Sequence, residues 1–456
     1  MPVLSRVYDF FRSRRLAAAL LAATAVWSAL ATVVPQRGSA AARSSPASGL
    51  AAAIGLDHAF SAPIFLALAV LLMCSTAACA LERTRGAMRL WRRASTGDPR
   101  ILPSGSNSDF TVALGDASEA ARSVREAFRE AGLVVRSASD EAVFATSARF
   151  GVWGSPVFHW LLVLLIAVIG AGQLTRAEGL MGVPVGSARL DTRESYGVVS
   201  EGPLHKRFTM LTVAVPSLEL THVVDGIDRG PTPYVELYDG PQPVASGYVF
   251  PNHPLRYKSL VVHSNDVGLA VTLTAPDGAT TDVLLDFDED ACVARSASVL
   301  EIAGPDGTTK LELSVPLETL RGRCVTALPR EPRVEWAASG PSGRSSGVVA
   351  PGERFEPLPG FEVGVGSVRY YARLSVADDW SVYPMYLIFA LAAIALAIAL
   401  FAPYREAAAL IEVQPGAAVV HVRARHVRRD PSFARRLQGC VERFSGHRSH
   451  DSHKEV

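Results

Sequence analysis

Four long uncharged apolar runs constrain this chain more than any other feature of its sequence. A helix needs about 20 apolar residues to cross a bilayer, and a spanning segment must satisfy its backbone hydrogen bonds within itself. We therefore expect an integral membrane protein with four membrane-spanning helices, in agreement with 49% hydrophobic and only 20% charged residues. The first run lacks a signal-peptide cleavage pattern, so we interpret it as an uncleaved helix. The runs are Leu16–Val34, Phe60–Leu81, Pro156–Leu174 and Tyr383–Ala402.

The arginines that flank these runs predict how the chain crosses the membrane. Cytoplasmic loops carry an excess of Lys and Arg. Arginines are dense before the first run, after the second and after the fourth, whereas the 35–59 loop holds only Arg37 and Arg43. We expect both termini and the 82–155 loop to be cytoplasmic, and the long segment after the third run to lie outside. Because the arginines gather next to the membrane, nucleic acid is not an expected partner.

The long segment after the third run is rich in short strand patterns. Its β-branched or alternating stretches are separated by Asp239-Gly240, Asp277-Gly278 and Asp306-Gly307, and Asp-Gly is typical of tight hairpin turns. Many short strands with such turns favour a sandwich or an open barrel. We therefore predict a large extracytoplasmic all-β domain, sandwich-like or barrel-like.

Two smaller segments are expected in the cytoplasm. The 82–155 loop shows a strand, a helix and two further strands, which predicts a small α+β element. In the tail, a short hairpin precedes Ser432–Phe444, which has the pattern of a basic amphipathic helix near anionic lipid. The predicted organisation is a lead-in at 1–15, helices at 16–34, 60–81, 156–174 and 383–402, an outer loop at 35–59, the cytoplasmic α+β loop at 82–155, the extracytoplasmic β-rich domain at 175–382 and a basic cytoplasmic tail at 403–456.

His159 is the candidate site residue, because it is an ionisable side chain inside the third apolar run. It lies a few residues inside the cytoplasmic end, roughly 5 Å deep at 1.5 Å per residue. One interpretation is an interfacial histidine wetted by headgroup water within an aromatic belt of Trp153 and Trp160. The other is an axial ligand to a haem iron, a role that imidazole commonly fills.

The cysteines and the remaining histidines offer little further chemistry. Cys292 and Cys324 both fall in the predicted outer domain, where they could form a disulfide, although two unpaired core cysteines fit equally well. A polar tail contains His447, His450 and His453. Because such a tail is unsuited to hold a fixed shape, we predict no metal site there. The sequence shows no phosphate-binding loop, dinucleotide fingerprint, nucleophile elbow or zinc spacing. We therefore expect no enzyme activity from this chain on its own.

Several stretches together resemble the ResB family of membrane proteins of System II cytochrome c biogenesis. The exit of the first helix, Thr32-Val33-Val34-Pro35-Gln36, resembles the family's Thr-x-x-Pro-Gln. The entry to the third helix, with Gly151 and His159, is similar to a glycine-plus-histidine pattern of the family. Gly172-Gln173-Leu174 resembles the start of its outer domain, and Asn252-His253-Pro254-Leu255-Arg256-Tyr257 resembles its Asn-x-Pro-Leu-x-Tyr stretch. The order of helices and the large outer domain extend the resemblance over nearly the whole chain.

The resemblance implies a role in a bacterial cytoplasmic (inner) membrane. ResB-type proteins work with a polytopic partner of the ResC/CcsA type, which presents haem. Together they move haem across the membrane and attach it to the CxxCH cysteines of apocytochrome c. His159 occupies the place of the family's haem-ligating histidine, and the second axial ligand would come from the partner. The alternative is a scaffold protein without haem, in which four helices anchor an outer β domain for another membrane assembly and His159 is structural.

Overall fold

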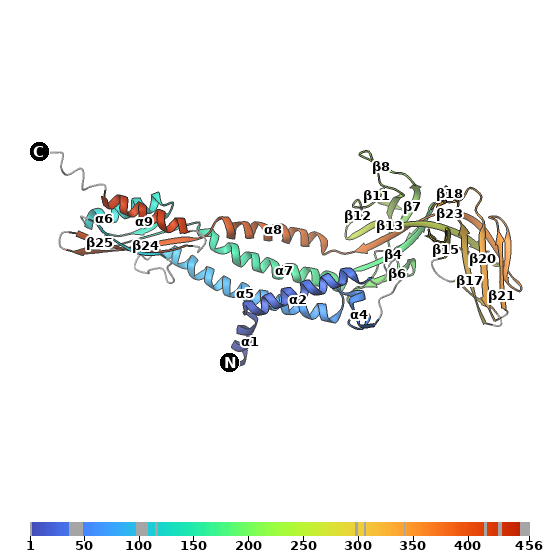
Figure 1. Ribbon diagram of the computed structural model, residues 1–456, viewed down its shortest axis with the longest axis horizontal. Coiled ribbons are helices and arrows are strands. Elements are labelled where there is room, and N and C mark those ends of the chain that lie inside the picture. Colours follow the sequence, from blue (N-terminus) through green and yellow to red (C-terminus); the bar gives the residue numbers. More distant parts are fainter. Residues whose placement is uncertain are drawn as a thin grey trace. The chain divides into compact units, whose positions relative to one another are not determined.

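Four helices of the chain are long and apolar enough to cross a membrane, as the sequence predicts. A computed structural model describes residues 2–35, 49–96, 108–114, 117–296, 300–304, 307–341, 343–414, 417–426 and 431–446. The chain divides into two units. A helical unit comprises Met1–Gln36, Ala47–Gly170 and Tyr383–Val456, and a β unit comprises Arg37–Pro46 and Ala171–Val382. The spanning helices are α2 (Arg14–Val33), α5 (Pro63–Thr96), α7 (Gly154–Thr175) and α8 (Val382–Phe401) (Figure 1).

Helix α5 is longer than its apolar run. It continues through the arginine-rich stretch after Leu81 and ends only at Thr96. Arg, Ala, Leu and Met are good helix formers, and this stretch contains no proline that would stop the helix. The first part of the predicted 82–155 loop is therefore helical. Preceding α2, a short helix α1 (Pro2–Phe11) lies against α5, where the Ser75 hydroxyl donates to the Phe11 carbonyl over 2.9 Å.

The connection between α2 and α5 is partly ordered. It contains the helix α4 (Gly49–Ala53) and the single turn η1 (Leu56–His58). The indole N–H of Trp27 donates to the Ala59 carbonyl over 2.9 Å, and Leu56 and Ala59 are buried beside it. The end of the predicted 35–59 loop thus packs on α2 instead of standing free.

The predicted cytoplasmic loop and tail form one domain, not two. A five-stranded antiparallel sheet runs in the order β1-β25-β24-β3-β2. Three of its strands precede α7 and two follow α8, so the loop at 82–155 is not an independent α+β element. The elements are β1 (Ser108–Leu114), α6 (Ala117–Glu130), β2 (Val134–Ala138), β3 (Ala142–Ser147), β24 (Arg405–Gln414), β25 (Ala417–Arg425) and α9 (Pro431–Gly446).

Helices α6 and α9 lie side by side on this sheet (Figure 1). Phe128 of α6 and Phe433 and Leu437 of α9 are fully buried against alanines and valines of β24 and β25. This corrects the prediction of a lipid-bound helix at Ser432–Phe444, because the apolar face of α9 is already covered by protein. The amphipathic pattern is real, but the five-stranded sheet, which includes the tail hairpin β24–β25, covers the apolar face of the helix.

A buried acidic group joins this sheet to α5. Glu406 of β24 is fully buried, its Oε1 lies 3.7 Å from Nη1 of Arg93, and the Tyr404 hydroxyl donates to its Oε2 over 3.0 Å. Burial, followed by the neighbouring Glu406 carboxylate, raises the pKa of Tyr404 above its ordinary range. Tyr404 therefore stays protonated and remains a donor to the carboxylate.

The β unit contains two main sheets, both antiparallel. A four-stranded sheet has the order β11-β10-β7-β5, and a twelve-stranded sheet follows the path β21-β20-β17-β15-β14-β13-β23-β4-β6 with β12, β16 and β22 paired at its side. Among the described residues no sheet closes on itself into a barrel. The elements of the first sheet are β5 (Ser187–Leu190), β7 (Thr212–Glu219), β10 (Thr232–Asp239) and β11 (Gln242–Tyr248). Those of the second are β4 (Ala177–Pro184), β6 (Tyr196–Glu201), β12 (Leu255–Tyr257), β13 (Leu260–Thr274), β14 (Thr280–Asp288), β15 (Val293–Ser296), β16 (Leu300–Gly304), β17 (Gly307–Pro316), β20 (Val334–Gly340), β21 (Gly343–Val349), β22 (Arg354–Leu358) and β23 (Phe361–Asp378).

Two long strands, β13 and β23, pass through two separate cores of the β unit (Figure 1). Near the start of β13, Leu260 and Val262 pack with valines of β7 and β10, so the two sheets share a core there. Further along, Leu269 and Val271 pack with β14, β17 and β20 in a second core. The pairing of β13 with β23 shifts its register twice, between Ser264 and Asp266 and between Val271 and Leu273. Bulges of this kind bend a strand, which lets one pair of strands serve both cores.

Candidate functional site

The structure places His159 in the second turn of α7. Its Nδ1 lies 2.8 Å from the Ser155 carbonyl oxygen, one turn earlier in the same helix. A carbonyl can only accept, so Nδ1 carries the proton and Nε2 keeps its lone pair. Within the described part of the chain, no hydrogen-bond partner is found for Nε2. In the neutral imidazole, this bond selects the tautomer that a metal ion binds, with Nδ1 fixed by the backbone and the Nε2 lone pair free.

Two glycines allow α7 to approach α8 closely just before His159. A Cβ atom on Gly151 would collide with the carbonyl oxygen of Ala402, and one on Gly154 would lie 2.6 Å from the Ala399 nitrogen. Both positions thus need glycine because helix backbone fills the space that a side chain would occupy. These contacts fix the start of α7 and with it the position of His159 relative to α8.

A second set of contacts joins the same region to α5. Nη1 of Arg83 donates to the Ser155 hydroxyl over 2.8 Å, and the Trp160 indole N–H donates to the Thr84 hydroxyl over 3.1 Å. One turn earlier, the Arg149 guanidinium stacks over the Trp91 ring at 4.0 Å, and Trp91 also packs on Trp153. Arg83, Thr84 and Trp91 were not predicted as site residues. The sequence signal that could have identified them is the arginine-rich stretch after the second apolar run, because this stretch extends the same helix.

The two tryptophans of the predicted aromatic belt therefore have specific partners. Trp153 packs on Trp91, and Trp160 is 41% exposed while its polar N–H is bonded. An exposed ring with a satisfied N–H suits a membrane interface. A belt of Trp153 and Trp160 is compatible with both interpretations of His159, the wetted interfacial histidine and the haem ligand, because other side chains form it.

Helix α7 is the least covered of the four spanning helices. Only 6% of its most apolar window is buried, against 17% in each of the other three. Among the described residues of these helices His159 is the sole histidine. The described spanning helices thus offer one imidazole as a candidate axial ligand for a haem iron.

Haem is the group that the resemblance implies for this site. A neutral imidazole with a free Nε2 and a hydrogen-bonded Nδ1 fits one axial position of haem iron. The described residues contain no cluster of three or more His, Cys, Asp or Glu side chains that could hold a metal ion by itself. The tail histidines His447, His450 and His453 lie outside the described residues.

Cys292 and Cys324 form a disulfide in the β unit, with their Cα atoms 5.4 Å apart. Cys292 follows β14, and Cys324 ends the small hairpin of β18 (Thr319–Leu320) and β19 (Arg323–Cys324). Both cysteines pack at the margin of the second core of the β unit. Cys74, Cys79 and Cys440 are free.

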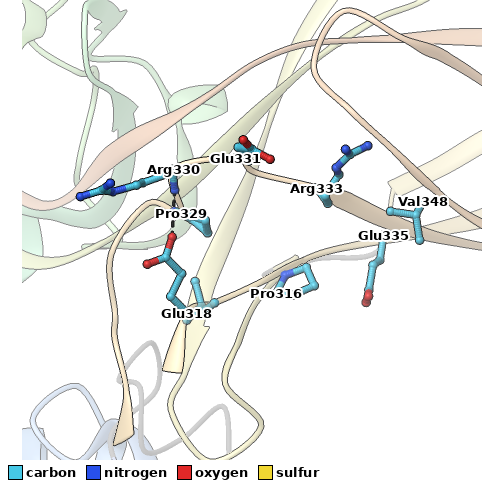
Figure 2. A pocket seen from close by; sticks show the side chains of 9 residues that line it. Pro316, Glu318, Pro329, Arg330, Glu331, Arg333, Glu335 and Val348 are labelled. Carbon is cyan, nitrogen blue, oxygen red and sulfur yellow. Dashed lines mark hydrogen bonds between the residues drawn. The ribbon is translucent and has the colours of Figure 1, made fainter. Parts of the chain in front are cut away.

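A shallow pocket of about 560 Å³ lies close to this disulfide. Figure 2 shows Pro316 and Glu318 on one side and Arg330, Glu331 and Arg333 on the segment that leads to β20. The Arg330 backbone N–H donates to Oε1 of Glu318 over 3.1 Å. The lining contains no histidine, cysteine, serine or threonine, so it offers neither a nucleophile nor a soft metal ligand.

Comparisons with known proteins identify the family of the chain. A comparison with curated proteins finds no match. The model of the ResB-like family matches residues 14–291, which include three of the four spanning helices, His159 and a large part of the β unit. Because this match covers more than half of the 456 residues, the protein belongs to the ResB-like family.

Proposed function

We propose that this protein is the haem-handling membrane subunit of a System II cytochrome c synthase complex. The family is associated with cytochrome c biogenesis, in which its members are membrane components of a non-catalytic type. In the proposed complex the chain works with a polytopic ResC/CcsA-type protein. The two move haem across the membrane and attach it to the CxxCH cysteines of apocytochrome c.

His159 is the residue that carries this proposal. When bound, haem brings the vinyl groups that form the thioether bonds with the cysteines, so this chain has to hold and orient it. The Ser155 carbonyl fixes the imidazole with its Nε2 lone pair free. The sparse cover of α7 leaves room for a partner helix that would supply the second axial ligand.

The proposed complex also requires a particular orientation in the membrane. The arginines at the end of α5 and the basic segment after α8 favour a cytoplasmic position for the five-stranded sheet. The β unit would then lie outside the bacterial cytoplasmic membrane. Its Cys292–Cys324 disulfide fits an oxidising compartment. In that place the β unit would contact the partner or the apocytochrome.

The alternative is a scaffold that binds no haem, and one observation favours it. The close approach of Gly154 to α8 and the contacts of Arg83 and Trp160 fully account for the position of α7 without a ligand. In this reading the bond between His159 and Ser155 only satisfies a polar side chain near the interface. The two functions differ in the haem content of the assembled complex.

The visible absorption spectrum of the complex purified in detergent with its polytopic partner tests the proposal. We expect a Soret band for the wild-type complex, its loss in His159→Ala, and its recovery when imidazole is added to His159→Gly. Trp160→Phe is the matched control, because it changes the neighbouring ring and spares the imidazole. A colourless wild-type complex, or an unchanged Soret band in His159→Ala, would refute the haem-ligand role and favour the scaffold.

A further inference from the structure

A second histidine with a free Nε2 lies in the β unit, at the base of a small hairpin. The hairpin consists of β8 (Val223–Val224) and β9 (Ile227–Asp228). Its turn residues Asp225 and Gly226 have φ values of 53° and 74°, as a type I′ turn requires. His222 precedes β8 and its carbonyl accepts from the backbone N–H of Arg229 over 2.8 Å. His222 and Arg229 are therefore cross-strand neighbours.

A carboxylate fixes the tautomer of His222. Nδ1 lies 2.5 Å from Oε2 of Glu219, and the Tyr248 hydroxyl donates to Oε1 of the same carboxylate over 2.6 Å. A glutamate is a carboxylate at neutral pH, and both of its oxygens can only accept hydrogen bonds here. Nδ1 therefore carries a proton, and no hydrogen-bond partner of Nε2 is found in the described part of the chain. A carboxylate behind an imidazole is the usual support of a metal-ligating histidine.

Aromatic rings hold the plane of this imidazole. His222 stacks on Tyr248 with ring centroids 4.4 Å apart, and its centroid lies 5.7 Å from that of Phe250. The side chain is nevertheless 14% exposed. Tyr248 and Phe250 thus fix the ring without enclosing it, and Nε2 remains open to a ligand.

An arginine without an acidic partner completes the group. The Arg229 guanidinium lies 5.7 Å from the Phe250 ring centroid, and no carboxylate pairs with it in the described residues. Its Nε is buried and has no hydrogen-bond partner among them. Beside it on the hairpin, Ile227 is 54% exposed and Val223 is 60% exposed. The hairpin thus presents a metal ligand, an unpaired cation and exposed apolar side chains together.

Haem matches these three features with its iron, its propionates and its apolar ring edge. We propose that the β8–β9 hairpin carries a haem-binding site in which His222 Nε2 ligates the iron, Glu219 holds the imidazole and Arg229 pairs with a propionate. The choice of haem over a bare metal ion rests on the function proposed above. A bare ion would not use Arg229, so the two ligands can be told apart.

His253 provides a matched control on the same surface. Its ring stacks on Phe250 with centroids 4.6 Å apart, and its Nδ1 lies 3.1 Å from the Tyr248 carbonyl oxygen. Like His222 it has a free Nε2 among the described residues, and it is exposed. Unlike His222, it has a backbone carbonyl and not a carboxylate at Nδ1. Any haem binding due to exposed histidines in general should depend on His253 at least as much as on His222.

The test is a haemin titration of the full-length chain in detergent without its partner, in a His159→Ala background, followed by Soret absorbance. We expect saturable binding that is lost in His222→Ala and weakened by about 10- to 100-fold in Glu219→Gln, which removes the charge behind the ligand. Arg229→Gln should weaken haemin binding several-fold and leave binding of Zn²⁺ unchanged. His253→Ala should bind as the parent does.

Glu219→Gln also guards against a folding artefact, because glutamine keeps the shape and an acceptor for Nδ1. Equal haemin binding in His222→Ala, or an equal loss in His253→Ala, would overturn the proposal. Binding of Zn²⁺ but not of haemin would overturn the assignment to haem. Failure here is distinct from failure of His159, since haemin titration of the His159→Ala chain reports on His222, and the co-purified complex that carries His222→Ala reports on His159 alone.

Discussion

Removal of the Cys292–Cys324 disulfide should destabilise one core of the β unit by an amount that depends on the length of the loop that the disulfide closes. The two cysteines are separated by 32 residues in sequence. In the chain-entropy description, cross-linking a loop of that length removes about 12 cal/mol/K from the unfolded chain, or about 3.7 kcal/mol at 25 °C. The disulfide ties the end of β14 to the β18–β19 hairpin, and both sulfurs pack against the core that β14, β17 and β20 share. Cys292→Ser should therefore lower the stability of this core.

Hydrogen exchange of backbone amides, read by mass spectrometry on the full chain in detergent, measures this loss locally. A change of about 3.7 kcal/mol corresponds to exchange about 500-fold faster in the strands of that core. The five-stranded sheet of the helical unit should keep its protection, since the disulfide constrains only the β unit. Exchange in β17 and β20 therefore reports the effect, and exchange in β24 and β25 serves as an internal reference.

The cross-link predicts a specific pattern among variants. Cys324→Ser should match Cys292→Ser, and the double variant should lose no more than either one, because each change breaks the same bond. Cys74→Ser makes the same chemical change at a free cysteine of α5 and should leave β17 and β20 protected. Unchanged exchange in Cys292→Ser, or additive losses in the double variant, would refute the reasoning.

Two further predictions concern packing in the helical unit. Gly154→Val should push α7 from α8, because a Cβ there would lie 2.6 Å from the Ala399 nitrogen; a loss of about 1–3 kcal/mol should lower Tm in detergent. In Gly170→Ala, in the same helix, the added Cβ meets nothing within 4 Å, so this variant should not lower Tm. An equal Tm for the two variants would contradict the close approach of α7 to α8. Phe433→Ala should remove about 3–5 kcal/mol from the five-stranded sheet, because Phe433 is fully buried. Faster hydrogen exchange in β24 and β25 would show this loss of stability, and Gln438→Ala, at an exposed position of the same helix, is the control. Unchanged exchange in Phe433→Ala would mean that α9 does not belong to this core.

The spanning helices could be predicted because their signal is local. About 20 uncharged residues suffice to identify a crossing, and each of the four predicted runs overlaps one long apolar helix whose start lies within three residues of the start of the run. The division of the soluble parts could not be predicted in the same way. Strand β3 pairs with β24 on one edge, and β24 pairs with β25, so residues before α7 and residues after α8 share a sheet. Alternating patterns identify strands but not their partners, and the loop and the tail were therefore interpreted as separate elements.

The candidate site shows the same limit at the level of single residues. His159 could be found from the sequence, since an imidazole in an apolar run stands out. The need for glycine at positions 151 and 154 could not be predicted from the sequence, because it depends on the backbone of α8 that lies against Gly151 and Gly154. The hairpin that follows His222 could have been predicted from Asp225-Gly226, because Asp-Gly is the dipeptide that also marks the other predicted turns. The grouping of His222 with Tyr248 and Phe250 depends on the fold, because β10 and β11 lie between the hairpin and Phe250 in sequence.

The two imidazoles that we propose as haem ligands differ in one respect that bears on how the protein would use them. His159 is held by a neutral backbone carbonyl, and His222 is held by the Glu219 carboxylate. A charged acceptor at Nδ1 makes the opposite ring nitrogen a stronger donor than a neutral acceptor does. Ferric haem should therefore bind more tightly through His222 than through His159 when each acts as the only protein ligand. Glu219→Gln gives His222 a neutral acceptor like that of His159, so most of this difference in affinity should disappear in that variant. The carboxylate, and not the imidazole, would then determine which of the two sites binds haem more tightly.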